Sequence, residues 1–141
     1  MKIFIAASYS SQVNYETGAV FPEYKKWLEE NLTLIEQLGH TVFCALRADG
    51  YRINDSDPAQ AFSLDLEQIR SCDGMLAFIS EKPSIGVQTE VGVAVALGKQ
   101  VALASEPTVS IGYFNDAMVR AQAVQHVTLP LSEEKLRFFK E

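Results

Sequence analysis

The sequence predicts an α/β fold, a single-domain, Rossmann-like three-layer sandwich with a five-stranded parallel sheet. Short apolar runs alternate with helical patterns along the 141 residues, as in chains that pass repeatedly from strand to helix. The apolar runs contain few polar residues, which is typical of parallel strands covered on both faces. Right-handed crossovers leave few topologies, and the flavodoxin-like strand order 2-1-3-4-5 is the simplest of them.

The first part of the chain supplies two strands and a helix. We expect a strand at Ile3–Ala7, a helix from Pro22 to about Leu38 that ends at Gly39, and a strand at Thr41–Leu46. Apolar residues at helical spacing predict the inner stripe of that helix. These residues are Trp27, Leu28, Leu32, Ile35 and Leu38.

The second part continues the alternation. The segment Ser56-Asp57-Pro58 is a good helix start, and the helix that follows should end before Asp73. One side of this helix is expected to face inward, with Phe62, Leu66 and Ile69. The later elements are a strand at Met75–Ser80, a helix containing Glu90, a strand at Gln100–Ala104, a helix near Tyr113–Gln122, a strand near Val124–Leu129 and a helix from Ser132.

Composition excludes several classes of function. Hydrophobic residues make up 48%, charged residues 21%, and the net charge of −6 argues against a surface that binds duplex nucleic acid. No apolar run reaches about 18 residues, and the amino-terminal apolar run is too short for a signal peptide. Cys44 and Cys72 are isolated in the sequence, so we expect both to be free thiols in a reducing compartment. We therefore expect a cytoplasmic protein with no membrane or nucleic-acid partner.

Glu90 is the most informative residue, because it is a lone acid in the stretch Gly86–Lys99, which is otherwise built for burial. The stretch follows a strand across a Pro/Gly turn. We therefore expect Glu90 in the first turn of a helix, beside the crevice at the strand ends. The helix dipole would keep its carboxylate ionised, as a nucleophile must be. Acids also favour first turns for structural reasons, so the residues alone leave both interpretations open.

Asp65 is the second acid of interest. Helical spacing places it beside the inner stripe of its helix, whereas Glu67 points outward. A solvated position is the default for an acid on a helix. If Asp65 instead pairs with Glu90 across the end of the sheet, it would be a proton donor with a raised pKa.

Two long irregular segments, Ser8–Phe21 and Arg47–Asp55, follow strand ends and should rim the same crevice. The first lacks the glycines of a phosphate-binding loop, and its Tyr9 either stacks on a planar ligand or covers the sheet end. Arg47 in the second segment could grip a phosphate or a base edge. The acids Asp49, Asp55 and Asp57 lack the spacing of a calcium loop and are interpreted as a solvated turn and a helix cap.

Three segments together resemble the nucleoside 2-deoxyribosyltransferase superfamily, which includes N-hydrolases of nucleoside 5′-monophosphates. They are Lys2–Ser8 (KIFIAAS), Asp65–Asp73 (DLEQIRSCD) and Ser84–Gly92 (SIGVQTEVG), and the last is the most specific. The resemblance extends over about residues 2 to 120 and implies that 1–141 is one domain of this kind.

By this resemblance Glu90 is the nucleophile that attacks the anomeric carbon of the sugar, and Asp65 is the acid that helps release the base. The pairing of a nucleophilic carboxylate with an acid agrees with the chemistry of retaining glycosyl transfer. A second base resolves the covalent intermediate in a transferase, and water resolves it in a hydrolase. The resemblance implies no metal or organic cofactor. Transfer between bases is the first expectation, hydrolysis of a 5′-monophosphate the alternative, and a non-catalytic nucleotide sensor the second alternative.

The resemblance also implies a set of substrate contacts, some of them contributed by a neighbouring subunit of a homodimer or larger homo-oligomer. Ser84 matches a serine of the monophosphate hydrolases, whereas Asp116 suits a neutral 5′-hydroxyl, so these two positions conflict. The absence of a Gly/Arg-rich first loop favours nucleosides. Phe4 stands where many members have a tyrosine that orients the nucleophile, so Tyr9 is a candidate to replace that hydroxyl. The expected substrate contacts are Ser8, Tyr9, Arg47, Ser84, Gly86, Asn115, Asp116 and Met118.

Overall fold

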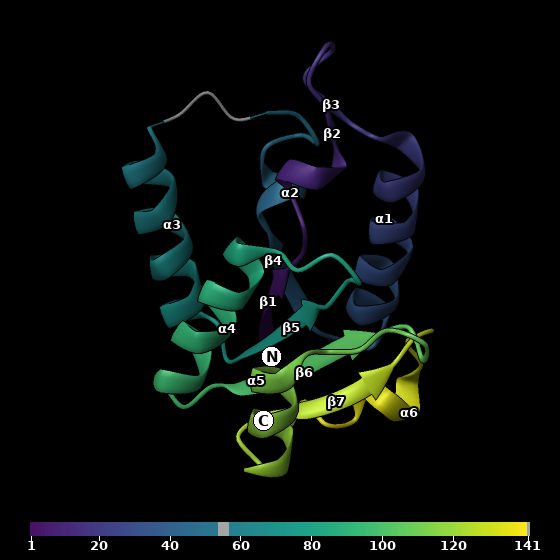
Figure 1. The fold of residues 1–141 in the computed structure, drawn as a ribbon, viewed down its shortest axis with the longest axis vertical. Helices are drawn as coiled ribbons and strands as arrows, with labels where there is room; N and C mark the ends of the chain where they lie inside the picture. The colour runs from purple at the N-terminus through teal and green to yellow at the C-terminus, as the bar shows by residue number, and fades with distance from the viewer. Residues whose placement is uncertain (54–56, 141) are drawn as a thin grey trace.

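The computed structural model describes residues 1–53 and 57–140 and forms an α/β sandwich around a parallel sheet (Figure 1). The strand order is β4-β1-β5-β6-β7, and every neighbouring pair is parallel. Counted within this sheet, the order is 2-1-3-4-5, so the predicted fold class and topology are confirmed. The strands are β1 (Lys2–Ala6), β4 (Thr41–Cys44), β5 (Gly74–Phe78), β6 (Gln100–Ser105) and β7 (Gln125–Thr128).

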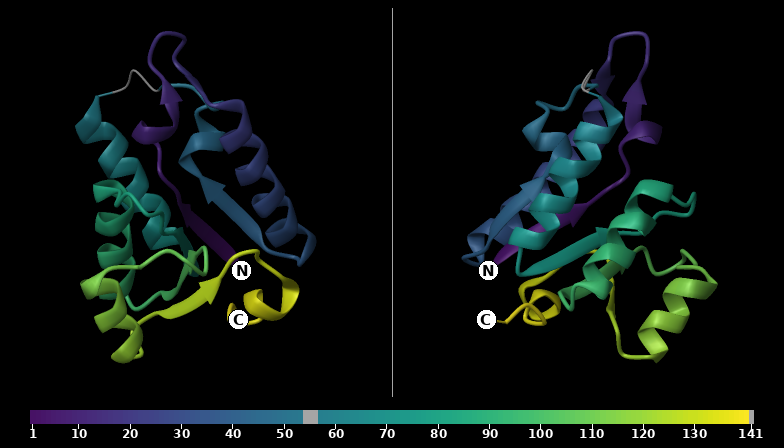
Figure 2. Two further views of the ribbon diagram at one scale, coloured as in Figure 1. Left: turned by 45° about the vertical axis from the view of Figure 1, so that its right-hand side comes forward. Right: turned by 90° about the vertical axis from the view of Figure 1, so that its left-hand side faces the viewer.

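Helices cover both faces of the sheet, as Figure 2 shows from two further sides. One face carries α1 (Pro22–Gln37) and α6 (Glu133–Leu136), and the other carries α3 (Pro58–Ser71), α4 (Ile85–Ala96) and α5 (Tyr113–Arg120). Alternate residues of β1 serve the two cores, because side chains along a strand point to opposite faces: Ile3 packs with α1, and Phe4 with α4. The central strands β1, β5 and β6 are therefore buried on both sides, whereas the edge strands β4 and β7 are only partly buried.

The expected inner stripe of α1 is largely confirmed, since Leu28, Leu32 and Ile35 are fully buried. The expected stripe of α3 is only partly confirmed. Ile69 is buried, but Phe62 is 55% exposed. Figure 1 shows the reason: the first turns of α3 project beyond the sheet, whereas its last turns pack on it.

The two segments expected to be irregular contain regular structure. The first holds a 3-10 turn, η1 (Ser10–Gln12), and a small hairpin of β2 (Val13–Asn14) and β3 (Ala19–Val20). The expected strand Thr41–Leu46 is wrong after Cys44, where the chain turns into α2 (Ala45–Ala48). The Ala-Leu-Arg-Ala sequence of α2 has strong helix formers, which favours that turn over a longer strand.

The predicted helix start at Ser56-Asp57-Pro58 corresponds to the start of α3. Asp57 is the cap, and its carboxylate accepts a hydrogen bond from the Ala59 backbone N–H at 3.2 Å, with Pro58 in the first turn. Ser56 and Asp55 lie outside the described residues. In the described ranges, none of the helices has the length and apolar character needed to cross a membrane.

Candidate active site

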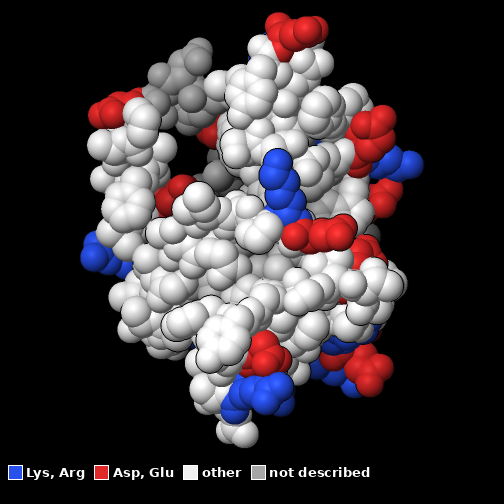
Figure 3. Space-filling view, in the orientation of Figure 1, with Lys and Arg blue, Asp and Glu red and all other residues white. Residues whose placement is uncertain are grey.

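A cavity of about 420 Å³ opens at the carboxyl edge of the sheet, between the first loop, the α2 turn and α3. Figure 3 shows the molecule hollowed beside α3, with acidic atoms at the edge of the hollow. Parallel α/β sheets bind ligands at this edge, where the strand order reverses between β1 and β5. The walls are mostly apolar, and the polar side chains in them are Tyr9, Ser10, Tyr15, Asp49, Asp65 and Gln68.

Asp65 lines this cavity from the eighth position of α3 and is half-buried. Burial raises the pKa of its carboxyl group, and the charge of Asp49 raises it further. The expected direction of the shift is therefore confirmed; the charge that raises the pKa of Asp65 is that of Asp49, and Asp65 in turn raises the pKa of Glu90. Its role as a proton donor stays a prediction.

Glu90 occupies the sixth position of α4 and is half-buried. The expectation of a first-turn, ionised carboxylate is wrong, because the helix dipole acts mainly on the first turn and Glu90 lies in the second. Burial and the nearby Asp65 carboxylate raise the pKa of Glu90 to about 8. The structure thus brings the two acids together and favours the protonated form of Glu90 near neutral pH.

No hydrogen bond to the Glu90 side chain offsets this shift anywhere in the described ranges. Phe4 lies in the core at 1% exposure, with its ring 5.5 Å from that of Phe43. The Tyr9 hydroxyl, the expected substitute, instead lies 3.1 Å from an Asp49 carboxylate oxygen and also donates to the Arg52 carbonyl. Tyr9 therefore organises the cavity wall and does not orient Glu90.

A second cavity of about 400 Å³ adjoins the first, since Ser10 and Tyr15 line both. Its other side is the start of α4, where Lys82, Ser84 and Gly86 line it. The Ser84 hydroxyl caps the helix by accepting a hydrogen bond from the Val87 N–H at 3.3 Å. Its own O–H is still a donor, so this pocket presents hydroxyls, an ammonium group and a helix amino terminus.

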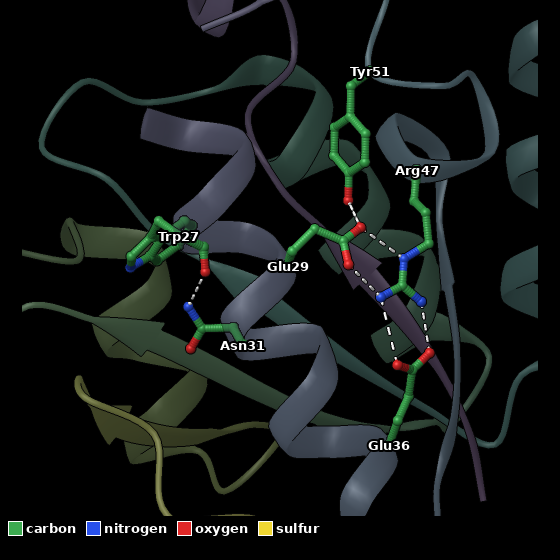
Figure 4. Close-up of polar contacts among 6 residues, drawn as sticks. All are labelled: Trp27, Glu29, Asn31, Glu36, Arg47 and Tyr51. Atoms are coloured by element: carbon green, nitrogen blue, oxygen red, sulfur yellow. Dashed lines mark hydrogen bonds and ion pairs between the residues drawn. The ribbon is translucent and has the colours of Figure 1, made fainter. Parts of the chain in front are cut away.

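Arg47 does not line either cavity, so its predicted ligand contact is not supported. Its guanidinium group instead binds two acids of α1 (Figure 4): one nitrogen lies 2.9 Å from Glu29 and another 2.6 Å from Glu36. Glu29 also accepts a hydrogen bond from the hydroxyl of Tyr51. The arginine holds the pKa of the Glu29 carboxyl below its usual range. Arg47 therefore anchors the α2 turn to α1.

The remaining residues predicted to contact the substrate are buried, packed against the core or paired with other residues of this chain. Ser8 is buried at the end of β1. Asn115 is buried and exchanges hydrogen bonds of 2.9 and 2.8 Å with Gln88, which joins α5 to α4. Asp116 is exposed and pairs with Arg120 at 2.8 Å, and Met118 packs against the core. The single chain does not bring these α5 residues to the cavities.

Sequence reasoning missed Asp49 and Lys82. Asp49 was interpreted as a solvated turn residue, but it lines the cavity beside Asp65. Nothing local marks it, because its position depends on the unexpected helix α2. Lys82 lies in the expected turn before α4. Ser10 and Tyr15 of the distant first loop line the same cavity, so the sequence around Lys82 does not show that it lies there.

Comparison with known proteins gives a consistent result. A family model for nucleoside 2-deoxyribosyltransferase matches residues 17–127. Similar solved structures include the CMP N-glycosidase BcmB of Clostridium botulinum, with 23% identity over 97% of this chain and 95% of that chain and a TM-score of 0.69. The 2-deoxyribosyltransferase of Bacillus psychrosaccharolyticus has 23% identity over 92% of this chain and 86% of that chain, with a TM-score of 0.66. The solution structure of BlsM has 25% identity over 91% of this chain and 80% of that chain, with a TM-score of 0.73. No curated protein matches the chain.

Proposed function

The chain belongs to the nucleoside 2-deoxyribosyltransferase family and is an enzyme that acts on N-glycosyl bonds; we propose that it cleaves a (deoxy)nucleoside through a covalent glycosyl intermediate on Glu90. In this proposal a second nucleobase then takes the sugar. The observation that carries it is a cavity of base-binding size at the carboxyl edge of the sheet that is lined by Asp65, whose carboxylate raises the pKa of the neighbouring Glu90.

The chemistry follows from the two acids. The Glu90 carboxylate attacks the anomeric carbon as the bond from that carbon to the base nitrogen breaks, and Asp65 supplies the proton that the departing base takes up. The incoming base then attacks the same carbon and displaces Glu90, while its own proton returns to Asp65. Glu90 must first lose the proton that it holds in the free enzyme. The active form therefore carries the shared proton of the pair on Asp65.

A substrate panel tests this function. The protein is incubated with nucleosides and 5′-monophosphates, each with and without an acceptor base, and products are separated by chromatography. We expect exchanged nucleoside when acceptor is present, since the intermediate partitions to the added base. Release of free base alone, unaffected by acceptor, would identify a hydrolase. Ligand binding without any product would identify a non-catalytic sensor and contradict the proposal.

The second candidate is hydrolysis of nucleoside 5′-monophosphates, favoured by the cavity at the start of α4. Lys82 and the hydroxyls of Ser10 and Ser84 suit an anion, and they adjoin the cavity proposed for the base. We expect Lys82→Ala to raise KM for 5′-monophosphates by about tenfold and to leave nucleosides unaffected. The control is Lys26→Ala, an exposed lysine on α1. Equal effects on both substrate classes would exclude a phosphate role for Lys82.

We also propose that the enzyme is a homodimer or larger homo-oligomer with shared active sites. Three large apolar side chains at the starts of α4 and α5 are strongly exposed: Ile85 at 86%, Tyr113 at 89% and Phe114 at 75%. Asp116 lies on the same helix as two of them, and its carboxylate is on the surface, paired with Arg120. Analytical ultracentrifugation should show that the wild-type protein is at least a dimer. Phe114→Ser should shift the distribution of species towards the monomer. A monomeric wild-type protein with full activity would contradict shared sites.

A further inference from the structure

The cavity beside Asp65 contains a second carboxylate, that of Asp49, which the proposed chemistry does not use. Resting on the proposed function, we propose that Asp49 selects the base, and that the preferred bases carry an exocyclic amino group beside an unprotonated ring nitrogen. Cytosine and adenine have this arrangement, whereas uracil and hypoxanthine do not. Asp49 is then a specificity-determining residue of the same site.

Asp49 is held in place against the cavity by several contacts. Its backbone N–H donates to the Ala45 carbonyl at 2.9 Å, and the Tyr9 hydroxyl lies 3.1 Å from one of its carboxylate oxygens. The α2 turn that precedes it is anchored to α1 through Arg47. Asp49 is therefore a positioned acceptor and not a mobile surface acid.

The cavity suits a planar aromatic ligand. Its apolar walls come from separate elements, with Phe43 at the end of β4, Ile53 after α2 and Leu64 on α3. Its volume of about 420 Å³ is within the range of small-molecule sites and exceeds that of a single base. Asp49 and Asp65 are the two acids among its polar side chains, so they have a large influence on which base is accepted.

The two acids present different hydrogen-bonding groups. Asp65 must be protonated to donate to the departing base, and the neighbouring charge of Asp49 favours that state. The pair then offers one donor, Asp65, and one acceptor, Asp49. Cytosine matches it with the N3 acceptor and the N4 amino donor. Uracil presents N3–H and O4 at the same positions, so donor would face donor and acceptor would face acceptor, and such buried mismatches are costly.

The test compares kcat/KM for deoxycytidine with that for deoxyuridine, and for their 5′-monophosphates. We expect the wild-type enzyme to prefer the cytosine member of each pair by about 100-fold. Asp49→Asn should lower that ratio by about tenfold or more, because its amide also presents N–H donors to O4 of uracil. Taking the ratio within one variant cancels any general loss of rate. Glu67→Gln, which removes an exposed acid from the outer side of α3, is the matched control and should leave the ratio unchanged.

Equilibrium binding separates this inference from the proposed function. Deoxycytidine and deoxyuridine are titrated into the wild-type and Asp49→Asn proteins by calorimetry, with Glu90→Gln introduced into both so that no turnover occurs. Tighter binding of deoxycytidine that Asp49→Asn removes would support base selection even if the wild-type protein shows no turnover. Turnover of both substrates at equal efficiency, an unchanged ratio in Asp49→Asn, or binding of neither ligand would overturn the role of Asp49. The first two of these outcomes leave the glycosyl chemistry intact.

Discussion

Glu90→Gln should reduce kcat/KM by about 10⁴-fold or more while leaving the fold intact. The amide has nearly the shape of the protonated acid that occupies this position in the free enzyme, but it cannot form the bond to the sugar. Mass spectrometry after rapid quenching should detect a glycosylated wild-type protein, with the modification on the peptide that carries Glu90, and no adduct in the variant. Full turnover by Glu90→Gln would end the assignment of the nucleophile.

The same substitution should stabilise the protein at high pH. Because the pKa of Glu90 is raised to about 8 in the folded state, the folded protein keeps a proton that the unfolded chain loses near pH 4.5. Stability therefore falls as pH rises from about 4.5 to 8, and Glu90→Gln removes this loss. We expect a gain of about 2 kcal/mol in unfolding free energy at pH 9 and no gain at pH 4, measured by urea denaturation. Thr89→Ser, on the exposed side of α4, is the control.

Asp65→Asn should lower kcat/KM by about 10²- to 10⁴-fold for ordinary bases, because the amide cannot donate the proton that the departing base needs. The loss should be much smaller for a nucleoside analogue whose base leaves readily as an anion. Chromatographic assay of free or exchanged base measures both substrates. Equal losses on the two substrates would indicate that Asp65 binds or positions, and does not act as the acid.

The pH profile provides an independent test of the same assignment. The wild-type profile of kcat/KM should be bell-shaped with its alkaline limb near pH 8, because one proton shared by Asp65 and Glu90 is needed for activity. In Asp65→Asn only the ionisation of Glu90 should matter, so the rate should rise with pH to a plateau. Its midpoint should lie below pH 8, since the Asp65 charge that raises the pKa of Glu90 is gone. An alkaline limb retained in the variant would contradict this coupling.

The succession of strands and helices could be predicted from the sequence because its signals are local. Apolar runs, the proline at the start of α1 and the cap at Asp57 each depend on a few neighbouring residues. The order of the sheet followed from those elements and from crossover handedness, and the family from short motifs around Asp65 and Glu90. The errors in the predicted fold, such as the missed helix α2 and the expected burial of Phe62, lie where the chain leaves the sheet.

The chemistry of the site depended on contacts between distant segments. The sequence by itself determined that two acids, Asp65 and Glu90, belong to the carboxyl edge of a parallel sheet. Only the tertiary structure decided that burial and Asp65 raise the pKa of Glu90, that Asp49 lines the cavity, and that Arg47 is neutralised by α1. The reason is physical: hydrophobic periodicity is set by neighbours along the chain, whereas the pKa and the hydrogen-bonding capacity of a side chain are set by burial and by charges from other elements.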